Sequence, residues 1–227
     1  SIDDIKRLCE FAAPFQVRIY VTVNTLFTSD ERMSAVKMML EMKDIGISAF
    51  IIQDLSLLPL LKEVGPWKEE FHASTQCAIR TPERAKELAD MGFTRLILER
   101  ELSLEMIRAI RDAVPKEVEL ECFVHGALCV CYSGDCYLSE YLTGRSANKG
   151  NCAHTCRWKY KVYLEEENRP NEFMEISEDS HGTYIMNSRD LCLLPRLNEI
   201  LPVGLNSFKI EGRNKSEYYA AITAHAY

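Results

Sequence analysis

The sequence lacks the basic surplus that is common in proteins that hold nucleic acid permanently. Its 227 residues include 27 Lys and Arg against 34 Asp and Glu, so the formal net charge is −7. A standing nucleic-acid-binding role usually shows an excess of positive charge. The composition therefore argues against a constitutive DNA- or RNA-binding protein and leaves room only for contact through a local basic patch.

Long apolar runs are also missing. No stretch approaches the roughly eighteen apolar residues of a membrane-spanning helix, and the opening SIDDIKRLCEF is charged and amphipathic instead of resembling a secretory signal. Nine cysteines in such a chain are typical of reduced thiols in a cytosol, not of a disulfide framework. We therefore expect a cytoplasmic protein that makes no contact with a membrane.

Several catalytic templates are absent as well. The sequence contains no G-x-S-x-G elbow, no H-E-x-x-H helix, no Walker A loop and no G-x-G-x-x-G turn after a strand. These absences disfavour serine-hydrolase, zinc-protease, P-loop and dinucleotide chemistry. Any chemistry must come from another group of residues.

Strand-like and helix-like segments alternate along the first half of the chain at the spacing of βα units. The predicted strands are apolar and β-branched, as in a buried parallel sheet, and they are 17–24, 48–54, 71–76, 94–100, 118–124 and 206–212. The predicted helices are 2–11, 29–45 (with Ser29 as its N-cap), 55–64, 82–91, 103–114, 191–201 and 215–227. Short antiparallel strands are expected at 160–164, 173–176 and 183–186. Strict alternation predicts an α/β fold with a parallel sheet.

Polar side chains at the ends of these strands favour a barrel over an open sheet. Asn24, Gln76, Glu99, Glu121 and Glu211 stand at or near the carboxyl ends of different strands, and in a (β/α)8 barrel those ends build the active site. We therefore predict a TIM-barrel-like fold, with an open doubly wound sheet as the alternative. Six units are too few to close a barrel, so we expect one that is incomplete at both ends or completed by another chain.

A cysteine-rich segment interrupts the barrel pattern. Residues 1–124 form consecutive βα units, 125–187 hold the cysteine-rich segment and a small antiparallel β excursion, and 188–227 resume the barrel. The spacing C-x6-C, fifteen residues, then C-x3-C joins Cys129, Cys136, Cys152 and Cys156. Thiolates suit soft metals, and a [4Fe–4S] cluster takes four of them. Four-cysteine zinc and a set of buried free thiols are the alternatives, and Cys131 and Cys192 are the substitute ligands.

Charged side chains at strand ends are the candidates for acid–base and anion-binding roles. His125 ends a strand beside the cysteine segment, and Glu121 and Glu211 are placed to serve as general acid or base. Arg100 and Arg213 are suited to hold a carboxylate or phosphate through two parallel hydrogen bonds. The alternatives are a structural hydrogen bond for His125 and a ring of salt bridges for the other four.

Four aromatic residues accompany basic residues in the cysteine segment, as base stacking would require. They are Tyr132, Tyr137, Tyr141 and Trp158, near Arg145, Lys149 and Arg157. We expect at least two of the four rings to belong to the core.

Three stretches of the chain resemble the collagenase-like peptidase family, peptidase family U-32. They are ECFVHGALCVCYSGDCYLSEYLTGR, NKGNCAHTCRWKY and SFKIEGRNKSEYY, and the resemblance extends to 19–24. It implies a barrel-like catalytic domain that performs either proteolysis or oxygen-independent hydroxylation of tRNA, of ribosomal RNA or of a ubiquinone precursor. Members begin before Ser1 and continue past Tyr227, so a chain truncated at both ends is expected.

The resemblance is nearest to the RNA-hydroxylating branch, where it implies a [4Fe–4S] cluster and prephenate as the hydroxyl source. The residues that match the ligand positions are Cys129, Cys136, Cys152 and Cys156. We therefore expect hydroxylation of an RNA base, foremost tRNA uridine. In this hypothesis Arg100 and Arg213 bind the carboxylates of the donor, and His125 and Glu121 move protons. The alternatives are a U-32 peptidase and a non-catalytic, cluster-bearing subunit that works with a partner protein.

Overall fold

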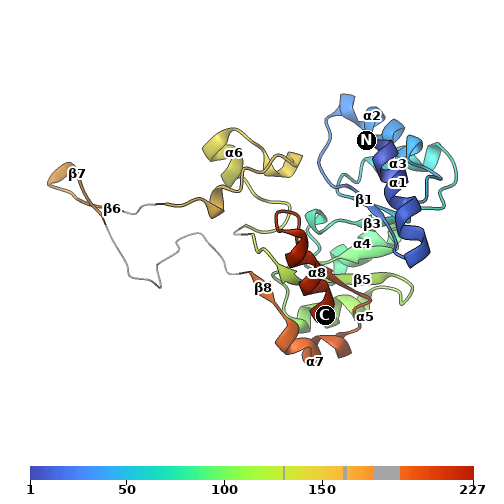
Figure 1. The fold of residues 1–227 in the computed structure, drawn as a ribbon. Coiled ribbons are helices and arrows are strands. Elements are labelled where there is room, and N and C mark those ends of the chain that lie inside the picture. The colour runs from blue at the N-terminus through green and yellow to red at the C-terminus, as the bar shows by residue number, and fades with distance from the viewer. Residues whose placement is uncertain (130, 161–162, 176–189) are drawn as a thin grey trace.

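Six parallel strands form a curled sheet at the centre of the molecule (Figure 1). They are β1 (Tyr20–Val23), β2 (Ala49–Ile52), β3 (Glu70–Ala73), β4 (Arg95–Ile97), β5 (Glu119–Gly126) and β9 (Ser207–Ile210). Their order in space follows the chain from β1 to β5, and β9 then pairs with β5. The computed structural model describes residues 1–129, 131–160, 163–175 and 190–227. Over these residues the sheet is a partial barrel of the TIM type, as predicted.

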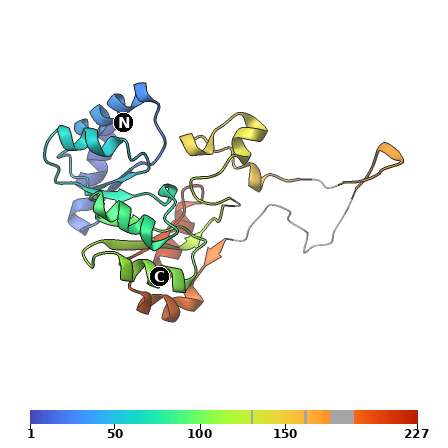
Figure 2. The ribbon, with the colours of Figure 1, turned by 180° about the vertical axis from the view of Figure 1, so that it is seen from behind.

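Helices pack against the outer face of the sheet (Figure 2). They are α1 (Ile2–Ala12), α2 (Ser29–Glu41), α3 (Leu57–Glu63), α4 (Pro82–Asp90) and α5 (Leu104–Ala113). Alternate strand residues such as Phe50 and Leu96 face the helices and contact one continuous apolar core that includes Met39, Leu61 and Ile110. Full burial of each such side chain contributes about 2 kcal/mol. This core fixes the curvature of the sheet and therefore where the strand ends meet.

Helix starts follow from local capping. The Ser103 side chain accepts a hydrogen bond from Met106 N at the start of α5. A reciprocal capping box of Thr28 and Glu31 starts α2, so Thr28 is the cap and the prediction of Ser29 is wrong. The Glu31 side chain decides this, because it accepts from the backbone N–H of Thr28.

The predicted helix 191–201 is wrong over most of its length. The structure instead has the short strand β8 (Leu191–Cys192), a 3-10 turn (Leu194–Arg196), helix α7 (Leu197–Ile200) and a second 3-10 turn (Leu201–Val203). Pro195 and Pro202 cannot donate the backbone hydrogen bonds of a longer helix. Leu191 pairs antiparallel with Gly126 at the end of β5, so this segment extends the sheet.

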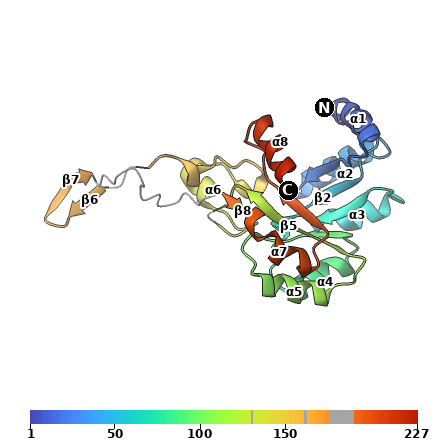
Figure 3. The ribbon, with the colours of Figure 1, turned by 60° about the horizontal axis from the view of Figure 1, so that its bottom comes forward.

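A small antiparallel sheet confirms the predicted β excursion. It joins β6 (Tyr163–Glu166) to β7 (Arg169–Glu175), while the predicted strand 183–186 lies outside the described residues. The last helix, α8 (Glu217–Ala226), lies on the opposite side of the parallel sheet from α4 and α5 (Figure 3). None of the helices within the described residues is both long enough and apolar enough to cross a bilayer.

The inner face of the sheet carries a buried ionic network at its base. Glu121 accepts hydrogen bonds from Arg95 Nη1 at 3.0 Å, from Lys209 Nζ at 2.9 Å and from Ser207 Oγ at 2.9 Å. Burial raises the pKa of Glu121, but Lys209, Ser207 and Arg95 together outweigh burial and hold that pKa below its usual range. The carboxylate is therefore a structural anion that ties β4, β5 and β9 together.

Glu121→Gln is expected to reduce the free energy of unfolding at neutral pH by about 3 kcal/mol, because it leaves two cations without their buried partner. A carboxylate with a lowered folded-state pKa stabilises above its unfolded pKa of about 4.3 and loses this effect as the pH falls through the folded value. The difference in free energy of unfolding between wild type and variant should therefore become smaller at acidic pH. Urea unfolding at a series of pH values measures it.

Glu119→Gln is the matched control, since Glu119 binds the same Arg95 at 2.7 Å from a side chain that is 37% exposed, against 6% for Glu121. We expect a loss of no more than about 1 kcal/mol from it. Equal losses from the two variants would contradict the structural role of Glu121.

Candidate active site and cysteine centre

A cavity of about 670 Å³ opens at the carboxyl ends of the parallel strands. Its apolar base is formed by Ile51, Ile97 and Phe123, which are buried against one another above the ionic network. The rest of its lining is Thr22, Asn24, Ser74, Thr75, Gln76, Arg100, Ala127, Cys129, His154, Arg157, Lys209, Ile210, Glu211, Gly212, Arg213, Asn214 and Lys215. The volume is typical of small-molecule sites, and the position is where barrels carry their chemistry.

Positive charge dominates the cavity wall in a chain whose net charge is −7. Five Lys and Arg line it against one carboxylate, that of Glu211. Three of the five are already engaged by the protein: Lys209 by Glu121, Lys215 by Asp190 and Arg157 by the Leu128 carbonyl and Asp190. The charge of this lining therefore favours an anionic ligand.

Arg100 and Arg213 are the cations left for a ligand. Within the described residues, neither guanidinium has a hydrogen-bonding or ion-pairing side chain. The Arg100 guanidinium carbon lies 3.6 Å from the centroid of the Phe123 ring, which holds the cation flat over the base of the cavity. Burial lowers the pKa of Arg100 from its usual value, but an arginine stays charged in proteins.

One of the four predicted thiols, Cys129, lines this wall, and the other three follow it in the cysteine segment. Burial raises the pKa of Cys129, and the thiols of Cys156, Cys136 and Cys152 raise it further, while Arg100 opposes them. The other three thiols therefore lie within electrostatic reach of Cys129. The Cys131 thiol also hydrogen-bonds to Cys136, and burial together with this contact raises the pKa of Cys131 to about 11.

A single zinc ion and a [4Fe–4S] cluster need different distances between the four sulfurs. Among the described residues, no three or more His, Cys, Asp or Glu side chains are placed to hold a metal ion. A single zinc ion needs its four sulfurs about 3.8 Å apart, whereas a [4Fe–4S] cluster binds each thiolate through a different iron and so keeps the sulfurs farther apart. The side chains as described do not form a single-ion site, and the choice between a cluster and zinc stays a prediction.

A loop against β3 and β4 holds the first cysteine pair in place. Gly134 has φ +85°, and a Cβ there would lie 2.6 Å from the Gln76 carbonyl oxygen, so only glycine fits. The Arg80 guanidinium bridges the loop to the barrel, since it binds the buried Glu99 at 2.7 Å and Asp135 at 2.6 Å. Asp135 directly precedes Cys136, so one arginine fixes that thiol relative to the sheet.

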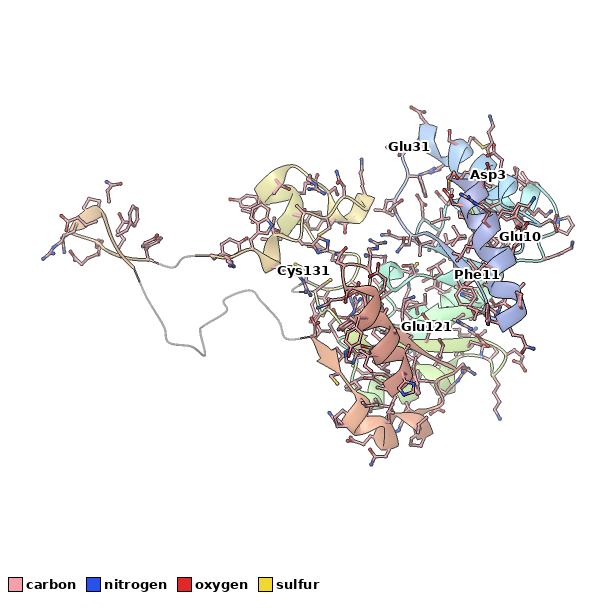
Figure 4. The ribbon with its side chains drawn as sticks, in the orientation of Figure 1. Asp3, Glu10, Phe11, Glu31, Glu121 and Cys131 are labelled. Carbon is pink, nitrogen blue, oxygen red and sulfur yellow. The ribbon has the colours of Figure 1, made fainter. Side chains whose placement is uncertain are left out.

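Helix α6 (Leu138–Thr143) organises the second cysteine pair. The buried Ser139 hydroxyl donates to the Arg145 carbonyl at 2.7 Å and accepts from Ala153 N at 2.9 Å. His154 adopts a left-handed conformation with φ 55°, and its backbone N–H donates to Cys152 Sγ at 3.3 Å. We call residues 127–129 and 131–160 the cysteine module; Cys131 lies where it meets the barrel (Figure 4).

The predicted acid–base residues do not all reach the cavity. Glu121 lies in the ionic network, and His125 Nδ1 lies 3.3 Å from the Tyr227 hydroxyl, with the ring packed against Tyr219 and Tyr227 of the α8 segment. Glu211 lines the cavity, but its carboxylate accepts from Ala127 N and Arg213 N at 3.3 and 3.0 Å. Glu211 thus ties the start of the cysteine module to the end of β9.

The structure thus brings some predicted residues together and separates others. Arg100, Cys129, Glu211 and Arg213 meet at the cavity. Arg157 was predicted only as a basic neighbour of the aromatic residues, and Lys215, which lines the same wall, and Arg80, which positions the loop, were not predicted. The position of Arg157, directly after Cys156, was the available signal for it, whereas nothing local marks Arg80.

Comparison with known proteins identifies the family. The model of peptidase family U32 matches residues 1–227. The chain belongs to peptidase family U32. It is 41% identical over 99% of its length to the 23S rRNA 5-hydroxycytidine C2501 synthase of Escherichia coli, and 37% identical over 92% to the tRNA hydroxylation protein P of the same organism.

The U32 chain spans 32% and 54% of the lengths of these two relatives. The solved structure of the U32 peptidase Mk0906 aligns with 53% of the chain at a TM-score of 0.46 and 18% identity. This U32 chain is thus related to proteins of tRNA and rRNA hydroxylation.

Proposed function

We propose that this U32 protein hydroxylates an RNA base with the help of a [4Fe–4S] cluster held by Cys129, Cys136, Cys152 and Cys156. The observation that supports the proposal is the position of Cys129, the first of the four proposed ligands, in the wall of a cation-rich cavity at the strand ends of a partial barrel. The similarity to one rRNA and one tRNA hydroxylation protein supports RNA as the substrate.

The cavity supports a small carboxylate such as prephenate as the hydroxyl donor. Arg100 and Arg213 are placed to bind its carboxylates through paired hydrogen bonds. Replacing a ring hydrogen by a hydroxyl releases two electrons and one proton from the base, so besides the oxygen donor an external electron-transfer protein must accept the two electrons, one at a time. An iron–sulfur cluster supplies one-electron transfer when bound. Because Glu121 and His125 do not line the cavity, the proposal gives them supporting roles in place of proton transfer.

Mass spectrometry of RNA tests the function. Nucleosides of tRNA and of 23S rRNA from cells lacking the protein should lose one hydroxylated pyrimidine, and the full-length wild-type protein should restore it. The Arg100→Lys variant should restore less than about a tenth of the wild-type level of this nucleoside. Lysine keeps the positive charge but cannot make the two parallel hydrogen bonds of the planar guanidinium. Unchanged hydroxylation in both RNA classes would refute the proposal, and loss in one class names the substrate.

A peptidase finds less support in the same cavity. Cys129 and His154 both line it, but a nucleophilic cysteine needs a base within hydrogen-bond reach. Within the described residues, the His154 ring contacts Asn214 at 3.3 Å and makes no hydrogen bond to Cys129. If the protein instead serves as a non-catalytic subunit, the purified chain should hydroxylate RNA only when its partner protein is added.

A further inference from the structure

Exposed aromatic rings are concentrated on the cysteine module. Tyr132, Tyr137, Tyr141 and Trp158 are all exposed, so the expectation that at least two of them belong to the core is wrong. The reason is that the module has no apolar interior of its own: within its described part, the fully buried side chains are Ser133, Ser139 and Thr155. The rings therefore face solvent, and the unfavourable free energy of exposing their apolar surface is not offset by packing.

Two of these tyrosines form a pair on one helix. Tyr137 and Tyr141 are four residues apart at the start of and within α6, which places them on the same face. They are 67% and 86% exposed, and neither hydroxyl has a protein partner among the described residues. Their faces and edges are available for a ligand.

The other two rings are held in fixed orientations. The Trp158 indole N–H donates to the Ala153 carbonyl at 3.2 Å, and the Arg80 guanidinium carbon lies 4.7 Å from the centroid of the Tyr132 ring. A ring that is already oriented loses little conformational freedom when something stacks on it. Tyr132 and Trp158 are therefore the pre-oriented rings of this set.

The charge of the module points to the kind of partner. Residues 127–160 contain four Lys or Arg against two Asp or Glu, in a chain whose net charge is −7. Aromatic rings interleaved with cations suit single-stranded nucleic acid, whose bases stack and whose phosphates pair with the cations. An acidic or purely apolar protein partner would use only one of these two features.

The cysteine module adjoins the cavity. Cys129, His154 and Arg157 belong to the module and line the cavity. A base that reaches the cavity must leave its stack, and the nucleotides beside it then lose a neighbour. Exposed rings on the adjoining module offer them a replacement.

We propose that the aromatic surface of the cysteine module, formed by Tyr132, Tyr137, Tyr141 and Trp158, binds single-stranded RNA by stacking on the nucleotides that flank the modified base. The choice of RNA as the occupant rests on the proposed function; the binding surface itself rests on the exposure of the four rings, the fixed orientation of Tyr132 and Trp158, and the local charge.

Fluorescence anisotropy with a short, labelled, uridine-rich single-stranded RNA tests the surface on the full chain. Tyr141→Ala should weaken binding about 10-fold, the usual range for one stacked base, and Tyr137→Ala with Tyr141→Ala should weaken it further. Tyr141→Phe should bind like wild type, because phenylalanine also stacks. Phe11→Ala is the matched control: Phe11 is 69% exposed on α1, away from Cys131 (Figure 4), and its loss should leave binding unchanged.

Wild-type affinity in the Tyr141→Ala and double variants would overturn the inference, as would equal losses from Tyr141→Phe and Tyr141→Ala. The affinity of the apo protein is measured separately from hydroxylation. If the tyrosine variants bind weakly while cellular RNA never loses a hydroxylated base, the binding surface stands and the proposed function fails.

Discussion

Cys136→Ser is expected to remove nearly all iron and acid-labile sulfide from anaerobically prepared protein, from about four of each per chain in the wild type. A hydroxyl cannot replace the thiolate as a ligand for a soft metal. The broad sulfur-to-iron absorption should disappear with the iron. The fold should persist, because the apolar core takes its cysteines from Cys9, Cys77 and Cys122 and none from the module. Metal analysis and circular dichroism together measure both outcomes.

Two other cysteines provide the controls for this experiment. Cys192→Ser alters an exposed thiol on β8 and should leave the iron content unchanged. Cys131→Ser removes the hydrogen bond to Cys136 and should lower the iron content by no more than a small fraction. Full iron in Cys136→Ser, together with its loss in Cys131→Ser, would show that the ligand set is wrong. A colourless protein that carries zinc would end the iron–sulfur proposal.

Gly126→Ala is expected to lower the free energy of unfolding by about 3 kcal/mol or more, the sum of backbone strain and overpacking. Gly126 has φ +113°, and a Cβ there would overlap the Glu211 carbonyl oxygen and lie 2.8 Å from Glu211 Cβ. Both partners are backbone-anchored parts of neighbouring strands and have no room to yield. Urea unfolding followed by circular dichroism measures the loss.

Gly144→Ala is the control that measures backbone strain without steric overlap. Gly144 also has a positive φ, of +72°, but nothing lies within 4 Å of its added Cβ. We expect it to cost only about 1 kcal/mol. If Gly126→Ala costs no more than Gly144→Ala, then the close approach of β5 and β9 is not a constraint on the chain.

The barrel was readable from sequence because its signals are local. Each parallel strand is a short apolar run, and several helices carry their own cap or proline, as at Ser103 and Pro82. The boundaries shifted where side chains compete for the same backbone groups, as with Glu31 and the cap of α2. The segment around Leu191 was misread because its antiparallel pairing with Gly126 is a long-range contact.

The sequence predicted individual residues of the site but not which of them lie together in space. The spacing of the cysteines marked the thiols, and the strand ends marked Arg100 and Arg213. Whether Glu121 would face the cavity or the ionic network depends on Lys209, which is 88 residues away in sequence. Periodicity carries no information about such a pairing. The exposure of the four rings was likewise decided by the absence of an apolar interior in the module, which composition alone does not show.

The attachment of the cysteine loop through Arg80 has a consequence for biogenesis. Arg80 and its buried partner Glu99 belong to the part of the chain that leaves the ribosome before Asp135 does, and chains acquire structure from the N-terminus during synthesis. Arg80 and Glu99 are therefore synthesised before the first of the proposed cysteine ligands. If the proposed cluster is present, the machinery that delivers iron and sulfide would then meet the Cys136 loop already attached to the barrel through Arg80.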